Sequence, residues 1–240
     1  MKKKVVISQP MFLPWIGIFE QIAAGDIFVH YDDAQFPQGR SFCSRVQLKA
    51  EEGTRWLSVP VKRTGKQLIK DVKIDQSKDW KQSHLGLFQH CYRQAQFFDL
   101  AMDLLESVYA YEGELLSDFC IFGIEKIANF LKLESSFTLS SSYRFTSSST
   151  QRLLELLTAQ QAEIYITGHG AKNYLDHELL ESQGINVKYM DYSLKGYGQL
   201  YGGFTPYVSV IDLIANTGET ASDYILAKTI DWKEFVLKSS

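Results

Sequence analysis

Apolar residues occur in short runs near the start of the chain, and these runs predict strands. Residues 5–7 and 27–31 are rich in β-branched and aromatic side chains, which favours two buried strands. Pro10 ends the first run, because proline supplies no N–H to a strand ladder. Residues 14–24 predict a helix between the strands, and Pro14 suits its first turn. A strand, a helix and a second strand in this order form a βαβ unit.

The middle of the chain has two different patterns. Residues 46–48 and 56–61 alternate like strands, within a segment, residues 37–73, that is rich in Lys and Arg. Residues 77–133 instead repeat apolar side chains at helical spacing, and residues 77–80 have the composition of an N-cap and first turn. This helical block is expected to form a cap beside the sheet.

A Ser- and Thr-rich segment follows the helical block. Residues 140–150 predict a loop, with Ser149 or Thr150 as the N-cap of a helix that ends at Ala159. A hydroxyl-rich phosphate clamp is the alternative interpretation of the same residues.

The C-terminal part returns to strand signals. Residues 164–166 predict a strand that runs into a Gly-x-Gly turn and the start of a helix, where backbone N–H groups are available to an anion. Residues 184–190 predict a further strand. Residues 207–218 predict a short helix closed by Gly218.

These elements predict the fold class α/β, with a mostly parallel Rossmann-like (HUP-like) sheet and a helical cap or insertion. Residues 1–76 are expected to form the N-terminal part of the α/β core with a basic β insertion. Residues 77–140 form the helical cap, and residues 141–240 the C-terminal part of the core, in a single compact unit. The turn after the first strand and the Gly-x-Gly turn are expected at one sheet edge, facing one anionic ligand.

Composition narrows the class of protein. The chain has 240 residues, 45% of them hydrophobic, which is enough for a sizeable core. The net charge of −3 gives no global basic surface for nucleic acid. The 3 cysteines form no CxxC motif, so neither zinc nor a disulfide framework is indicated, and a reducing cytoplasm fits best. The apolar run after the first lysines is too short for a signal peptide, and no segment is long enough to insert into a membrane.

Acidic and histidine side chains near the predicted sheet edge are the candidate catalytic groups. Asp32 and Asp33 follow the second strand, where a carboxylate can bind magnesium, a ribose hydroxyl or a substrate amine, although Asp also caps turns. His169, between the two glycines, is a candidate general base or phosphate donor, or else an ordinary loop residue. His84 and His90 lie six apart, which is not the spacing of a metal pair on one helix face, and no metal site is predicted.

The basic segment supplies candidates for binding a phosphorylated ligand. Arg40, Arg45 and Lys62 form a local excess of positive charge on an acidic protein. The alternative is that these side chains are simply solvated.

Several spaced motifs resemble the WbqC-like family of bacteria. They are Gln9-Pro10-x-x-Leu13-Pro14-Trp15-x-Gly17, Asp32-Asp33-x-Gln35-Phe36, Arg45 with Lys49, residues 56–60, Tyr165-Ile166-Thr167-Gly168-x-Gly170-Ala171-x-x-Tyr174-Leu175, Tyr197-x-Gln199, and residues 209–218 including Asp212. The family more often has His before the first Gln, where this chain has Ser8, and tends to have Asn beside the arginine, where this chain has Ser44.

The resemblance implies a role in O-antigen or other surface polysaccharide biosynthesis, including lipopolysaccharide. Some members are described as transferring glycine or another acyl group to the amino group of a sugar. The candidate catalytic residues remain Asp32, Asp33 and His169. The motifs and the residue-based arguments together suggest these substrate-binding candidates: Gln9, Pro10, Trp15, Gly17, Gln35, Arg40, Arg45, Lys49, Thr167, Gly168, Gly170, Tyr174, Tyr197, Gln199 and Asp212.

Three functions follow as hypotheses. The first is a transferase that N-acylates a nucleotide-linked amino sugar, with an amino acid such as glycine as the favoured acyl group and aminoacyl-tRNA among the possible donors. No cofactor is firmly predicted, but ATP with Mg²⁺ has to be involved if the acyl group arrives without an activated bond. The second is a nucleotidyltransferase or adenylating enzyme of the HUP type, although the His-x-Gly-His signature of such enzymes is absent from residues 14–17. The third is a non-catalytic module that binds a glycan precursor. The sequence indicates no oligomeric state.

Overall fold

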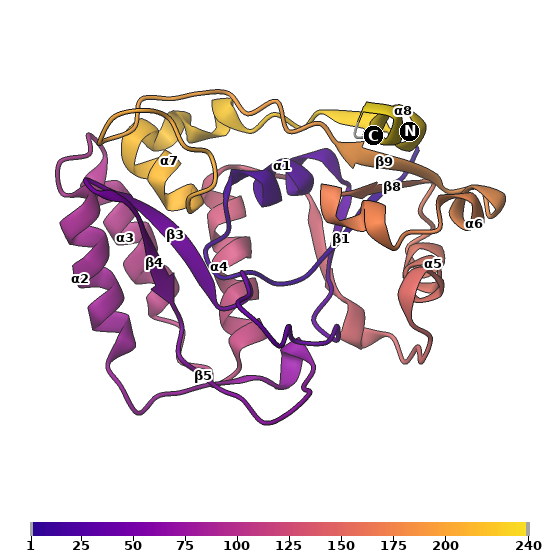
Figure 1. Ribbon diagram of the computed structural model, residues 1–240, viewed down its shortest axis with the longest axis horizontal. Coiled ribbons are helices and arrows are strands. Elements are labelled where there is room, and N and C mark those ends of the chain that lie inside the picture. The colour runs from indigo at the N-terminus through magenta and orange to yellow at the C-terminus, as the bar shows by residue number, and fades with distance from the viewer. Residues whose placement is uncertain (1, 239–240) are drawn as a thin grey trace.

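A six-stranded, mostly parallel sheet forms the centre of a mixed α/β protein (Figure 1). The computed structural model describes residues 2–238. The strands run parallel except for β10, which pairs antiparallel with β9. Along the sheet the order is β10 (Thr229–Asp231), β9 (Asn186–Met190), β8 (Ile164–Thr167), β1 (Lys4–Ser8), β2 (Ile27–His30) and β7 (Ser136–Leu139).

The strand order places a change of direction in the middle of the sheet. From β1 the chain builds outward through β2 to β7, then returns to the other side of β1 and continues through β8 to β9. The carboxyl ends of β1 and β8 therefore lie side by side while the connections that leave them diverge. Open α/β sheets bind ligands in the crevice at such a point.

Alternate strand residues face two different layers of helices. Val6, Phe28 and Ile166 pack in one apolar cluster with α1 (Ile16–Ala24), α4 (Leu116–Phe130) and α7 (Val210–Thr217). The intervening residues, such as Val5 and Val29, pack in a second cluster on the other face. That face is covered by α5 (Ser149–Ala159), α6 (His177–Ser182) and α8 (Trp232–Lys238). Because both faces are buried, the strands are apolar throughout rather than alternating, as the sequence of β1 indicates.

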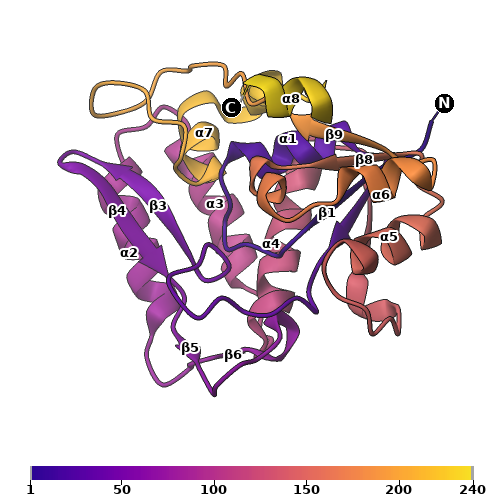
Figure 2. The same ribbon diagram turned by 45° about the vertical axis from the view of Figure 1, so that its right-hand side comes forward.

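The connection from β2 to β7 contains the predicted insertion, and Figures 1 and 2 show its hairpin and first helices on the left, with β8 and β9 on the right. Its first part is a hairpin of β3 (Arg45–Ala50) and β4 (Gly53–Ser58), followed by the short ladder of β5 (Val61–Lys62) with β6 (Lys73–Ile74) and the 3₁₀ turn η1 (Ile69–Asp71). Three helices follow, α2 (Trp80–Tyr92), α3 (Phe98–Tyr109) and α4, in the block where periodicity predicts them. Asp79 caps α2 by accepting a hydrogen bond from Gln82 N.

Two helices, α1 and α5, begin at other residues than the sequence predicts. α1 begins at Ile16 rather than Pro14, because Pro14 O accepts Val210 N and Trp15 pairs with Ser209 in a β-bridge. α5 has Ser148 at its N-cap position, so Ser149 and Thr150 lie inside the helix.

The Gly-x-Gly turn is also followed by a different element than predicted. The chain continues as the 3₁₀ turn η3 (His169–Asn173), and Asp176 already caps α6 three residues later. The remaining 3₁₀ turns are η2 (Ser140–Ser142) and η4 (Gly218–Tyr224). Gly218, with φ 61°, ends α7 as predicted. Among the described residues, no helix has the length and apolar character needed to cross a bilayer.

Candidate active site

A cavity of about 760 Å³ opens at the carboxyl ends of β1 and β8, where the sheet changes direction. Ser8 and Gln9 enter its wall from the end of β1, and Thr167 follows from the end of β8. Its volume lies within the range of small-molecule sites, roughly 300–1,000 Å³. Of the residues that the sequence predicts to bind substrate or catalyse, the wall of this cavity brings together Gln9, Trp15, Thr167, Gly168, His169, Gly170 and Tyr174.

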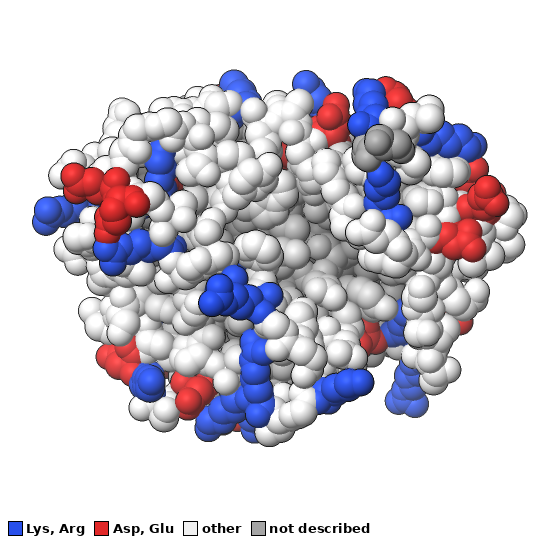
Figure 3. Space-filling view, viewed as in Figure 1, with Lys and Arg blue, Asp and Glu red and all other residues white. Residues whose placement is uncertain are grey.

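The wall of the main cavity is aromatic and uncharged. No Lys, Arg, Asp or Glu is among its lining residues in the described part of the chain, and Figure 3 shows a hollow with uncharged atoms in the middle of this face. Aromatic faces stack on sugar rings and bases, and hydroxyl and amide groups fix their orientation. The cavity thus suits an uncharged ring rather than an anionic group. Its aromatic residues are Trp15, Tyr31, Tyr165, Tyr174, Tyr192 and Tyr207.

Trp15 stands between two tyrosines of this wall. Its ring centroid lies 4.9 Å from that of Tyr192 and 5.6 Å from that of Tyr207. The same indole folds over the first turn of α1, where a Cβ on Gly17 would lie only 2.3 Å from the ring. Gly17 itself does not line the cavity. Because it has no side chain, the indole of Trp15 can occupy the space beside it.

His169 has a fixed tautomer. Its Nε2 lies 2.8 Å from the backbone oxygen of Met190, which can only accept, so Nε2 carries the proton and donates. Nδ1 is then the basic atom of the ring in its neutral form, and it accepts no hydrogen bond from the described residues. The ring is held between Tyr192 and Phe235, at centroid distances of 4.8 and 4.7 Å. An oriented imidazole with a bare nitrogen is what a general base requires.

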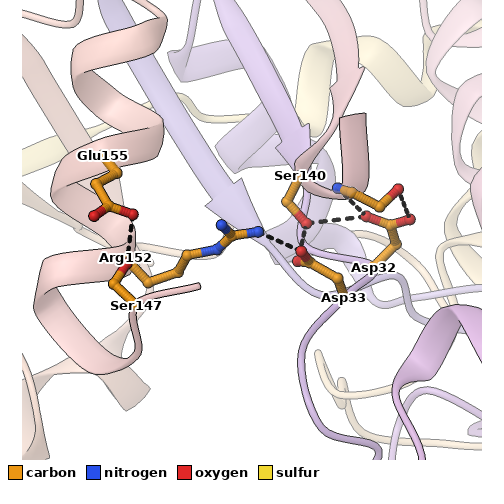
Figure 4. Close-up of polar contacts among 7 residues, drawn as sticks. Asp32, Asp33, Ser140, Ser147, Arg152 and Glu155 are labelled. Atoms are coloured by element: carbon orange, nitrogen blue, oxygen red, sulfur yellow. Dashed lines mark hydrogen bonds and ion pairs between the residues drawn. The ribbon is translucent and has the colours of Figure 1, made fainter. Parts of the chain in front are cut away.

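Asp32 and Asp33 do not line the main cavity, which corrects the expectation that they face the same ligand as the two turns. Asp32 is buried and accepts hydrogen bonds from Ser140 Oγ at 2.9 Å and from Ser141 N at 3.0 Å. Asp33 accepts from Ser140 Oγ and pairs with Arg152 (Figure 4). Both carboxylates tie the end of β2 to the segment after β7, and their direct role in catalysis stays a prediction.

A second group of predicted residues forms a buried network outside the main cavity. Asp212 accepts hydrogen bonds from Tyr92 Oη at 2.9 Å, Tyr197 Oη at 2.8 Å and Gln199 Nε2 at 2.7 Å. Lys49 Nζ donates to Gln199 Oε1 at 3.0 Å. Burial raises the pKa of Asp212, while these donors and Lys49 oppose the rise. The network joins β3 to α7 and to the segment 191–209, which carries Tyr192 and Tyr207 of the cavity wall.

The other predicted residues are dispersed around the cavity. Arg45 lies over the ring of Trp56, 3.7 Å from its centroid, and lines a separate cavity of about 280 Å³ that shares Trp15 with the main one. Gln35 pairs with Leu68 and lines a third cavity of about 390 Å³. Pro10 is buried, and Arg40 is exposed in the loop before β3.

Arg152 is the functional candidate that the sequence interpretation missed. The residue is 4% exposed and lines the 390 Å³ cavity together with Asp33. A signal was present, because an arginine four residues before Leu156 and next to Leu153 falls on the buried face of the predicted helix. Tyr192 and Tyr207 were also missed. Tyr192 belongs to a segment without regular structure, whereas Tyr207 was expected in the helix 207–218, which in the structure begins only at Val210.

This chain matches a family model and a curated relative. The model of the WbqC-like protein family matches residues 9–224, which include every lining residue of the main cavity except Ile7 and Ser8. The uncharacterized protein Rv1507c of Mycobacterium tuberculosis is 34% identical over 227 residues, covering 93% of this chain and 97% of that protein. No solved structure gives a significant match.

Proposed function

The chain belongs to the WbqC-like protein family, and on that premise we propose that it is a transferase that N-acylates the amino group of a nucleotide-linked amino sugar for O-antigen or other surface polysaccharide biosynthesis. The observation that carries the proposal is the uncharged, aromatic cavity with His169 held in a single tautomer at its rim. An amino sugar needs stacking surfaces for its ring and a base for its ammonium group, and this cavity offers both.

In the proposed reaction, His169 Nδ1 takes a proton from the sugar ammonium. The free amine attacks the carbonyl carbon of the acyl donor, a C–N bond forms, and the bond from that carbon to the donor's leaving group breaks. The leaving group departs with the electron pair of that bond and takes the proton that the attacking nitrogen loses as the amide forms, so that it leaves as a thiol from an acyl-CoA or as the hydroxyl of a tRNA from an aminoacyl-tRNA. The amide protons of Gly168 to Gly170 are candidate donors to the tetrahedral oxyanion. A free acid as donor would first require activation by ATP.

The test is to incubate the pure protein with a dTDP-amino sugar and glycine plus ATP, glycyl-tRNA or an acyl-CoA, and to follow the mass of the sugar nucleotide. A mass gain with one donor is expected, and His169→Gln should lower the rate by about 10²–10⁴-fold, the usual contribution of a general base. His90→Gln, on the exposed surface of α2, is the matched control and should leave the rate unchanged. The proposal fails if no donor gives product with the folded protein.

A nucleotidyltransferase or adenylating enzyme of the HUP type is the second candidate. The strand order with the cavity at its change of direction favours it, because that is where nucleotides bind in Rossmann-like sheets. Pyrophosphate release from ATP in the presence of the amino sugar or the acyl acid separates this reaction from direct transfer. A non-catalytic glycan-precursor module would instead bind the sugar nucleotide at micromolar concentration and give no turnover with any donor.

A further inference from the structure

The 390 Å³ cavity lies directly beside the main cavity and has the opposite chemical character. Tyr31 and Ser149 line both cavities, so the two adjoin at these residues. Whereas the wall of the main cavity is uncharged, the wall of the 390 Å³ cavity contains the charged residues Arg152, Lys70 and Asp33. Counting those charges leaves an excess of one positive charge in its wall.

The start of α5 forms one side of the 390 Å³ cavity, through Ser149 and the two residues before it, Ser147 and Ser148. Ser148 stands at the N-cap position, but its hydroxyl makes no capping hydrogen bond. A helix start has unsatisfied N–H groups and roughly half a positive charge, which an anion can satisfy. The helix has 11 residues, enough for this effect.

Arg152 gives the independent observation that a ligand belongs there. Its Nη2 donates to Asp33, whereas its Nη1 is buried and has no hydrogen-bond partner in the described part of the chain (Figure 4). A buried guanidinium nitrogen left without an acceptor is costly, so native proteins rarely leave one unpaired. An anion in this cavity would supply the missing acceptor, and guanidinium groups match phosphate oxygens well.

We propose that the cavity formed by Arg152, Lys70 and the first turn of α5 binds the diphosphate of a nucleotide-linked ligand whose uncharged ring occupies the main cavity. This inference deepens the proposed function and rests on it for the identity of the ring. The diphosphate would cross between the cavities at Tyr31 and Ser149. Asp33 would take no part in binding the phosphate; its carboxylate holds Arg152 in place.

Calorimetric titration with dTDP and with thymidine, in the absence of any acyl donor, tests the site. The wild-type protein should bind dTDP at least tenfold more tightly than thymidine, and inorganic pyrophosphate should compete with dTDP. Arg152→Lys keeps a positive charge beside Asp33 but removes the guanidinium fork, and should weaken dTDP binding by about tenfold without affecting thymidine. Arg144→Lys, at an exposed arginine in the segment before α5, is the matched control.

Lys70→Gln provides a second variant at a partly exposed position, in case Arg152→Lys fails to fold. Lys70→Gln should also weaken dTDP binding, but by a smaller factor than Arg152→Lys. Equal affinity of the wild-type protein for dTDP and thymidine would overturn the site, as would full dTDP affinity in whichever of the two variants folds. If dTDP binding depends on Arg152 but the protein has no acylating activity, the phosphate site stands and the proposed transferase function is rejected. If the protein acylates the sugar but both variants bind dTDP as the wild type does, the transferase function stands and the phosphate site is rejected.

Discussion

At the scale of single residues, a few buried polar side-chain atoms have no hydrogen-bond partner, which is unusual in a protein core. Within residues 2–238 these atoms are Glu20 Oε2, His30 Nδ1 and Arg152 Nη1. Arg152 lines a cavity, and the proposed phosphate would supply the acceptor that its Nη1 lacks. Glu20, on α1, is 0% exposed, and within the same residues its side chain accepts one hydrogen bond, from Leu226 N to Oε1 at 3.2 Å. A neutral carboxyl group fits this position better than a carboxylate, because a single donor does not compensate the lost hydration.

Glu20 gives a prediction about pH and stability. Burial raises its pKa from 4.5 to about 7, against the hydrogen bond from Leu226. The folded state therefore holds a proton that the unfolded chain releases near pH 4.5, so this contribution to stability is complete below pH 4.5 and is lost as the pH rises to 7. Over that interval Glu20→Gln should gain about 3 kcal/mol in free energy of unfolding relative to the wild-type protein.

Urea denaturation at a series of pH values measures the difference. Glu106→Gln, at an exposed position on α3, is the control and should run parallel to the wild-type curve. A constant offset between Glu20→Gln and the wild-type protein would mean that Glu20 is charged in the folded state.

At the scale of elements, α1 and the two strands that flank it, β1 and β2, were predictable from sequence because their signals are local, although α1 begins at Ile16 rather than Pro14. Periodicity places α2, α3 and α4 correctly for the same reason. The contacts that build the site are not local: Arg152 reaches Asp33 across 119 residues, and Lys49 reaches Gln199 across 150. No spacing rule connects such residues, so Lys49, Tyr197, Gln199 and Asp212 could be singled out by resemblance but not located. For the same reason the sequence prediction that Asp32 and Asp33 face the main cavity was wrong.

Gly17 offers a prediction about how α1 shapes the cavity. Alanine at this position would put a methyl group 2.3 Å from the Trp15 ring and displace the indole from its place between Tyr192 and Tyr207. We expect Gly17→Ala to weaken binding of the amino sugar nucleotide by tenfold or more, measured by calorimetry, while circular dichroism still shows a folded protein.

Gly86→Ala is a matched control for this substitution. Gly86 lies in α2, and nothing lies within 4 Å of the place that an added methyl group would take. Alanine there should stabilise the protein by about 0.5–1 kcal/mol through helix propensity and leave binding unchanged. Unaltered binding in Gly17→Ala would show that Trp15 does not contact the ligand.

Lys49 tests the network between β3 and the segment 191–209. Its Nζ is the donor to Gln199 and to the backbone oxygen of Gly203, and the residue is 4% exposed. Lys49→Met would leave the backbone oxygen of Gly203 unpaired and Gln199 Oε1 with only its hydrogen bond from Thr205 N, beside the buried Asp212, at a cost of about 3 kcal/mol in free energy of unfolding. Faster proteolysis within 191–209 should accompany the loss. The exposed Lys66→Met is the control, and equal stability of the two variants would contradict the role given to Lys49.

At the scale of the whole molecule, the helical insertion and the sheet share one core. The larger apolar cluster contains Phe88 of α2 and Phe119 of α4 together with Val6 of β1 and Ile214 of α7. Phe97 N also donates to Ala215 O at 2.9 Å, which connects the start of α3 to α7. A cap that could open or fold alone would need a core of its own, and these contacts argue that the chain folds as one unit.

One cooperative unfolding transition is therefore expected. Urea denaturation followed by tryptophan fluorescence and by circular dichroism should give coincident curves, since Trp80 lies in the insertion and Trp15 in the cavity. Phe88→Ala, which removes a side chain with 0% exposure from the insertion, should lower the free energy of unfolding by about 3–5 kcal/mol in both signals. If the insertion were a separate domain, Phe88→Ala would shift the unfolding midpoint of only part of the circular dichroism signal. The urea concentration at which dTDP binding is lost would then be the same as in the wild-type protein.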